Sequence, residues 1–135
     1  MGLENRSLKK MISKKVINTT YTIFLLSVLV VIFRTATHRY LIRKNSQYRY
    51  TIVEFIDRYH QGDVRGWNVR YSLNGVEYLD HCSDNDCFKC SKGNRFIIKV
   101  YLEDPEVFDI IYTIKALPNE TAPEAGWEVL PRADK

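Results

Sequence analysis

The chain has 135 residues, a formal net charge of +4 and a pI near 9.0. This length allows one ordinary domain, and a membrane segment would leave only about 90 residues for a body with one small core. Residues 1–44 contain nine Lys or Arg and one Glu, whereas residues 45–135 contain eleven Lys or Arg and fifteen Asp or Glu. The acidic body argues against nucleic acid as a partner, since binding phosphates requires clustered Lys and Arg.

The segment VINTTYTIFLLSVLVVIF, residues 16–33, has no charged residue and lies between basic clusters. As a helix it spans about 27 Å, close to the thickness of bilayer hydrocarbon. We expect a transmembrane helix at 16–36, after a basic segment at 1–15 and before a basic juxtamembrane linker at 37–47. The alternatives are a cleaved signal peptide and a buried core helix. The following RTATHRY is basic and lacks an Ala-x-Ala site, which favours an uncleaved signal anchor.

The side of the membrane is predicted from the basic residues that flank this helix. Five precede it and four follow it: Arg6, Lys9, Lys10, Lys14 and Lys15, then Arg34, Arg39, Arg43 and Lys44. The denser leading cluster favours a cytoplasmic N-terminus. We therefore expect a single-pass protein of the cell membrane that contacts the lipid bilayer through residues 16–36, with its body on the non-cytoplasmic side.

The pattern changes to alternation in GWNVRYSLNGVEYLDHC, residues 66–82. Apolar residues alternate with polar ones on both sides of Asn74-Gly75, a pair typical of a two-residue hairpin turn. Such a turn fixes the register, so Trp67 should face Cys82, and His81 should point to the opposite side of the sheet.

Strands are also expected at residues 48–60, 94–104 and 107–117, where β-branched and aromatic residues are frequent. We predict a four-residue turn, EDPE, with Pro105 inside it. The fold class is an N-terminal transmembrane helix plus an all-β domain at 48–116, with about five antiparallel strands in a bent sheet or partly open barrel of SH3-like or OB-like size. The tail, 117–135, should be loosely ordered, with Trp127 as its expected anchor.

The hairpin Y-x-L-N-G-V-E-Y and the later G-N-R-F-I-I-K-V-Y-L-E-D-P-E-V-F-D-I-I give the chain a resemblance to a known group. Over residues 64–114 it resembles uncharacterised bacterial single-pass membrane proteins with V-N-G-x-x-Y before G-x-x-Y-x-V-x-Y-x-P-x-x-P. The stretch from Tyr101 to Pro105 lacks the first Pro of the second motif. The resemblance implies a small C-terminal β domain on a membrane and no particular activity.

All three cysteines, Cys82, Cys87 and Cys90, lie in HCSDNDCFKC, residues 81–90. Cys87-x-x-Cys90 has the spacing of zinc knuckles, so zinc is one candidate ligand. The site would need a fourth ligand, and because His81 points away from Cys82, His60 or His38 would have to supply it.

A redox function would need the Cys-x-x-Cys pair at a helix N-terminus, but a turn and a strand follow it. A disulfide between Cys82 and either Cys87 or Cys90 fits a body outside the cytoplasm. The third thiol would then form an intermolecular bond or remain a buried free cysteine. In a cytosolic body, three reduced thiols are expected.

The sequence does not support a calcium-binding loop or a catalytic acid/base pair. Asp80, Asp84 and Asp86 do not match an EF-hand loop, which needs Gly at its sixth and Glu at its twelfth position. Glu54 and Asp57 should lie on opposite faces of the first strand, which argues against an acid/base pair. We identify no catalytic motif and therefore expect no enzyme.

The function expected from the sequence is a membrane-anchored, non-catalytic interaction or accessory module with a protein partner. It could also be part of a membrane complex, with small polar residues of the helix packing against other helices: Thr19, Thr20, Thr22 and Ser27. One alternative is a metal- or redox-dependent protein that uses the three cysteines. Another is an immunity-type protein that neutralises a toxin at the membrane, because a small acidic body suits a basic target.

Overall fold

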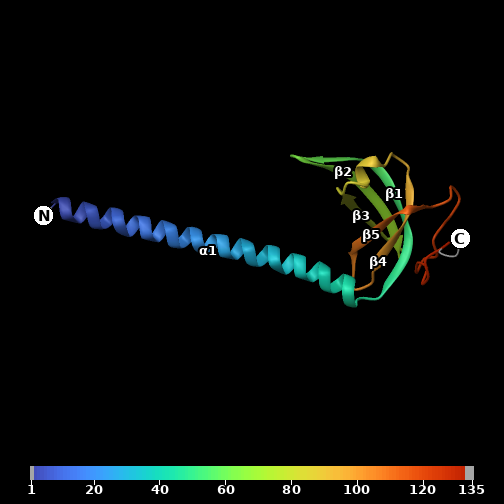
Figure 1. Ribbon diagram of the computed structural model, residues 1–135, viewed down its shortest axis with the longest axis horizontal. Helices are drawn as coiled ribbons and strands as arrows, with labels where there is room; N and C mark the ends of the chain where they lie inside the picture. Colours follow the sequence, from blue (N-terminus) through green and yellow to red (C-terminus); the bar gives the residue numbers. More distant parts are fainter. Residues whose placement is uncertain (1, 133–135) are drawn as a thin grey trace. The chain divides into compact units, whose positions relative to one another are not determined.

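The computed structural model describes the backbone of residues 2–132 and the side chains of residues 14–132. The chain divides into two compact units, residues 1–41 and 42–135. Helix α1 extends over Gly2–Asn45, and five strands form the β domain (Figure 1). The basic residues before Lys14, which we used to predict orientation, lie outside the described side chains.

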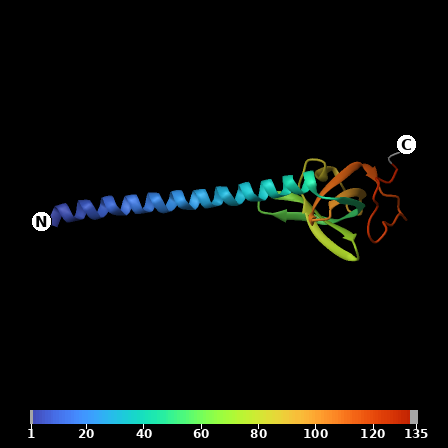
Figure 2. The same cartoon turned by 90° about the horizontal axis from the view of Figure 1, so that it is seen from below.

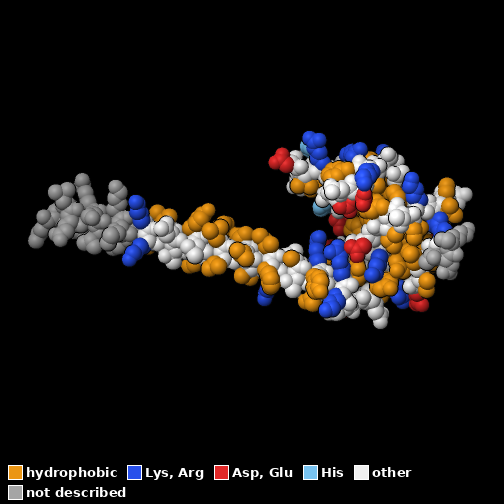
Figure 3. Space-filling view, viewed as in Figure 1, with side chains coloured by type: hydrophobic (Ala, Val, Ile, Leu, Met, Phe, Trp, Pro, Cys, Tyr) orange, Lys and Arg blue, Asp and Glu red, His pale blue; other side chains and the backbone are white. Residues whose placement is uncertain are grey.

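Helix α1 is long and apolar enough to cross a membrane, with a mean hydropathy of 2.2 in its most apolar window. None of that window is buried within the protein, and hydrophobic side chains cover much of the visible helix surface (Figure 3). Most of the expected basic juxtamembrane linker at 37–47 is helical, because the helix continues to Asn45. This stretch contains no Gly or Pro to end it, and Ser46 donates its backbone N–H to the Ile42 carbonyl.

The β domain is an open, five-stranded antiparallel sheet in the order β3-β2-β1-β4-β5, which confirms the expected fold class. The strands are β1 (Tyr48–Gln61), β2 (Val64–Leu73), β3 (Val76–Cys82), β4 (Arg95–Tyr101) and β5 (Asp104–Lys115). In both ribbon views the end of the β1–β2 hairpin projects beyond the other strands (Figure 2).

The β2–β3 hairpin has the predicted register, with Leu73 opposite Val76, Tyr71 opposite Tyr78 and Trp67 opposite Cys82. Its turn residues Asn74 and Gly75 have φ angles of 53° and 74°. Positive φ at both central positions is the geometry that an Asn-Gly pair adopts most readily, so the turn sets the pairing as the sequence predicted.

The β4–β5 turn differs from the predicted one. It consists of Leu102 and Glu103, with Tyr101 paired to Asp104, so Pro105 lies in β5 rather than in the turn. Proline lacks a backbone N–H, but β5 is an edge strand of the sheet, where that donor is not required. The Pro105 carbonyl accepts a 2.7 Å hydrogen bond from the Tyr71 hydroxyl.

The core covers one face of the sheet. It consists of Val53, Phe55, Trp67, Val69, Tyr71, Leu73, Phe96, Ile98 and Val100, together with the three cysteines. Strand β4 is buried on its second face as well, where Ile97 is inaccessible and Tyr101 packs with Ile42 and Val107. Simple alternation predicted only the first of these faces.

The tail has little regular structure up to residue 132, yet it is attached to the sheet at several points. Trp127 exchanges two backbone hydrogen bonds with Tyr50 of β1. They form an antiparallel bridge at a position of β1 that lies beyond the end of β2. The Arg95 guanidinium donates to the carbonyl groups of Leu117, Pro118 and Glu120. The expected anchor at Trp127 is therefore present as a backbone contact.

Gly66 in β2 lies directly against the backbone of Cys82, and a Cβ at this position would overlap the Cys82 carbonyl oxygen. We expect Gly66→Ala to lower the free energy of unfolding by about 3 kcal/mol, because backbone must move to admit the methyl group. Gly62→Ala is the matched control, since its Cβ would meet nothing within 4 Å and only its positive φ of 59° would be strained, costing about 1 kcal/mol. Urea unfolding followed by tryptophan fluorescence measures both variants, and equal losses would contradict the packing argument.

Candidate functional site: the cysteine loop and the free edge of the sheet

The cysteine loop is the connection from the end of β3 to the start of β4, and it closes over the core face. Cys82 ends β3, and Cys87 begins the short 3-10 helix η1 (Cys87–Lys89). All three cysteines are buried, Cys87 completely. The three cysteines therefore belong to the core, while the residues between them are exposed.

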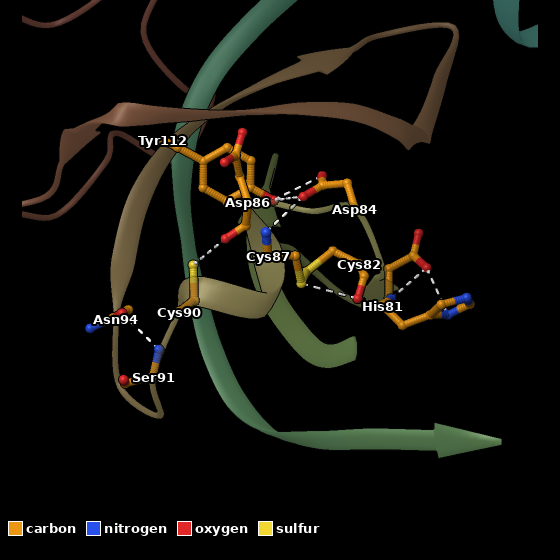
Figure 4. Close-up of a disulfide and its surroundings, with 10 residues drawn as sticks. His81, Cys82, Asp84, Asp86, Cys87, Cys90, Ser91, Asn94 and Tyr112 are labelled. Atoms are coloured by element: carbon orange, nitrogen blue, oxygen red, sulfur yellow. Dashed lines mark hydrogen bonds and ion pairs between the residues drawn. A yellow bond between two sulfur atoms is a disulfide. The ribbon is translucent and has the colours of Figure 1, made fainter. Parts of the chain in front are cut away.

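Cys82 and Cys87 form a disulfide with a Cα–Cα separation of 6.2 Å (Figure 4). Of the two pairings left open by the sequence, the structure contains this one, and Cys90 is a buried free cysteine. The bond joins the end of β3 to the first residue of η1. It therefore fixes the loop at the place where the chain leaves the sheet.

The Cys90 thiol donates to the Asp86 carbonyl oxygen at 3.5 Å. Burial raises the pKa of this thiol, and the negative charges of Asp84 and Asp86 add to the effect while Lys115 opposes it. Because only the thiolate is an effective nucleophile or metal ligand, these surroundings keep Cys90 in its unreactive form.

Asp84 has a structural role that the sequence did not reveal. Its carboxylate accepts the backbone N–H of Cys87 at 2.7 Å and the Tyr112 hydroxyl at 2.9 Å (Figure 4). Burial, the hydrogen bond to Asp84 and the charge of that carboxylate raise the pKa of Tyr112. The loop is thus attached to β5, and the two nearby acids also have partners, since Asp86 pairs with Lys89 and Asp80 accepts the backbone N–H of His81.

The residues proposed as zinc ligands do not converge. Two of the three sulfur atoms are bonded to each other, and no group of three or more His, Cys, Asp or Glu side chains is placed to hold a metal ion in the described part of the chain. His81 lies on the opposite face of the sheet, as predicted, where its ring stacks on Tyr59 with centroids 4.5 Å apart. His60 is exposed near the tip of the β1–β2 hairpin, and His38 belongs to α1.

The prediction for Glu54 and Asp57 is wrong. A β-bulge between Phe55 and Asp57 adds one residue to β1, so both carboxylates lie on the outer face, opposite the core. Glu54 pairs with Arg70 at 3.0 Å, and Asp57 accepts the Asn68 amide at 2.8 Å. Each acid is thus bound to its cross-strand neighbour.

Beside these residues, β3 forms one edge of the sheet, with Leu79 exposed to 70% on the outer face. A hollow of about 450 Å³ surrounds it, lined by Ile56, Asp57, Asn68, Leu79, Asp80 and His81. An exposed leucine next to unpaired edge backbone is the kind of surface that takes part in protein contacts. The sequence pointed to this strand only as half of a hairpin.

Comparison of the chain with protein-family models, curated proteins and solved structures finds no match. The geometry of the cysteine loop and of the β3 edge is therefore the basis for the function proposed below.

The disulfide closes a short loop, because its two cysteines are five residues apart in the sequence. The stabilisation expected from closing a loop of this length can be measured. We expect the double variant Cys82→Ala/Cys87→Ala to lose about 2 kcal/mol of unfolding free energy, since the bond restricts the unfolded chain. Urea unfolding of the detergent-solubilised chain, with and without reductant, measures this loss.

Cys90→Ala is the matched control for that experiment. It should remain as sensitive to reductant as the unsubstituted protein, whereas the double variant should no longer respond. Loss of the reductant effect in Cys90→Ala would show that Cys90 belongs to the bond.

Proposed function

We propose that the protein is a single-pass, membrane-anchored interaction or accessory module without catalytic activity, whose β domain lies on the non-cytoplasmic side of the cell membrane. The observation that supports the anchor most directly is the apolar surface of α1. Its large hydrophobic side chains from Val16 to Phe33 are at least 40% exposed, with no cover from the described protein.

A bilayer provides the missing cover. The uncharged segment at 16–33 has the length of the hydrocarbon layer, about 27 Å at the helical rise of 1.5 Å per residue. A soluble helix with this surface would expose large apolar residues to water at a cost of about 25 cal/mol per Å². Lys14 and Lys15 on one side and Arg34 and Arg39 on the other suit the two headgroup regions.

The disulfide supports a position of the β domain outside the cytoplasm. Cytoplasmic thiols are kept reduced, whereas disulfides persist in oxidising compartments. The dense basic cluster before the apolar span at 16–33 supports the same orientation, with the N-terminus inside.

The chemistry of the cysteine loop favours an interaction module over a metal or redox protein. Cys82 and Cys87 are joined to each other, Cys90 is buried with a raised pKa, and Asp84 holds the loop in place. These side chains stabilise the fold, which leaves the exposed β3 edge as the feature that suits binding. We therefore assign binding to the edge and structural support to the cysteine loop.

The anchor can be tested by placing charge at the centre of α1. We expect the double variant Leu25→Arg/Leu29→Arg to move from the carbonate-washed membrane pellet to the soluble fraction, because each Arg costs about 3 kcal/mol at the centre of a membrane helix. Thr37→Arg/Leu41→Arg, with the same spacing beyond the apolar span, should stay in the pellet.

The mass of the membrane-extracted protein completes the test. An uncleaved anchor has the full 15.9 kDa of the chain. A shorter species that begins after the apolar run at 16–33 would identify a removed signal peptide and contradict the anchor, as would retention of the Leu25→Arg/Leu29→Arg variant in the membrane.

A further inference from the structure

The backbone of β3 presents hydrogen-bonding groups at the open side of the sheet. In the two-residue hairpin, Leu73 and Val76 form the first hydrogen-bonded pair, and hydrogen-bonded and non-hydrogen-bonded pairs then alternate. The N–H and C=O groups of Glu77, Leu79 and His81 therefore point away from β2. The same three side chains lie on the outer face.

The side chains of these three residues are arranged symmetrically about Leu79. Glu77 and Leu79 are exposed, and the His81 side chain is half-exposed with its ring held by Tyr59. An acid therefore lies two residues before the exposed leucine, and an imidazole lies two residues after it. A strand with this order is chemically complementary to its own reverse.

We infer that β3 pairs with β3 of a second copy of this chain, antiparallel and centred on Leu79. In this register Leu79 faces Leu79 of the second copy, and Glu77 faces His81 of that copy in two equivalent pairs. Both pairs lie on one face, where an imidazole N–H can donate to a carboxylate. The two sheets then form one continuous sheet about a twofold axis, as in closed symmetric dimers.

Other registers are less favourable. A shift of two residues, the smallest that keeps the outer faces together, places Leu79 opposite Glu77 or His81 and separates the acid from the imidazole. A shift of four places Glu77 opposite Glu77 or His81 opposite His81. Only the register centred on Leu79 combines the apolar contact with both polar pairs.

The single copy already protects part of this edge. The Asp80 carboxylate accepts the His81 backbone N–H at 2.7 Å, which satisfies a donor that would otherwise face solvent. In the dimer that N–H is given to the Glu77 carbonyl of the second copy. The exchange of one hydrogen bond for another makes the pairing readily reversible.

A short edge gives a weak contact in dilute solution, so the inference rests on the proposed membrane anchor. Confinement of both copies to one membrane raises their effective concentration and favours a contact of modest intrinsic strength. The test therefore uses the full-length protein in its native membranes.

The test is disulfide cross-linking in a Cys90→Ala background, followed by non-reducing electrophoresis. Residues in a hydrogen-bonded antiparallel pair have Cα atoms about 5.5 Å apart, within disulfide reach. Leu79→Cys should therefore give a dimer on oxidation. Glu77→Cys is the matched control, because its two copies would lie about 14 Å apart along the strands and should cross-link at least tenfold less.

Co-expression of Glu77→Cys with His81→Cys should restore the cross-link by joining one copy of each. A dimer from Leu79→Cys that is no stronger than that from Glu77→Cys would overturn the inference, because it indicates random collision. A cross-linked species of Leu79→Cys with a different protein, without the dimer, would also overturn it.

Polar complementarity is tested separately by exchanging the charges in the Leu79→Cys protein. Glu77→Lys should reduce the cross-link by about fivefold, and the further change His81→Glu should recover it. Failure of the second change to recover the cross-link would contradict the register. Every sample is also assayed for membrane retention, so that loss of the anchor and loss of pairing between anchored copies are distinguished.

Discussion

The register between β2 and β3 determines where the main features of the β domain lie. It follows from the two-residue turn at Asn74-Gly75, in which both residues have positive φ angles and Leu73 pairs directly with Val76. Counting from this turn, Cys82 falls opposite Trp67 on the core face, and His81 falls on the outer face beside Tyr59. A shift by one residue would place the disulfide in solvent and the histidine in the core.

The cysteine loop helps to stabilise a β domain whose hydrophobic core is small. Fewer than 100 residues form the β domain, and domains of this size bury a limited fraction of their apolar surface. The disulfide, the Asp84 hydrogen bonds and the close approach of Gly66 to Cys82 hold the loop against the sheet. The loop thus stabilises the domain through covalent and polar contacts where additional apolar layers are lacking.

Features that depend on local sequence were predictable. The apolar run at 16–33, the Asn-Gly turn and the alternation around it gave the helix, the hairpin and the register. Features that depend on tertiary contacts were not. The bulge that brings Glu54 and Asp57 to one face leaves no mark in the composition of β1, and the bridge between Trp127 and Tyr50 joins distant segments.

The contrast is sharpest within the candidate site. The sequence identified the three cysteines and gave a disulfide as one of several alternatives, but not its pairing, because Cys87 and Cys90 are both close to Cys82 along the chain. The role of Asp84 depends on Tyr112 of β5, 28 residues away. The open edge of β3 required the strand order, since only the completed sheet shows that β3 has a single neighbour.

The state of the cysteines in the cell tests the account most directly, because the disulfide links the fold to the side of the membrane. Cells are quenched in acid, free thiols are alkylated, and the digested protein is analysed by mass. Trypsin cleaves after Arg70 and Lys89, so Cys82 and Cys87 share a peptide that excludes Cys90. We predict a closed, unalkylated peptide 71–89 and an alkylated Cys90. Alkylation of all three cysteines would place the domain in a reducing compartment and contradict the account.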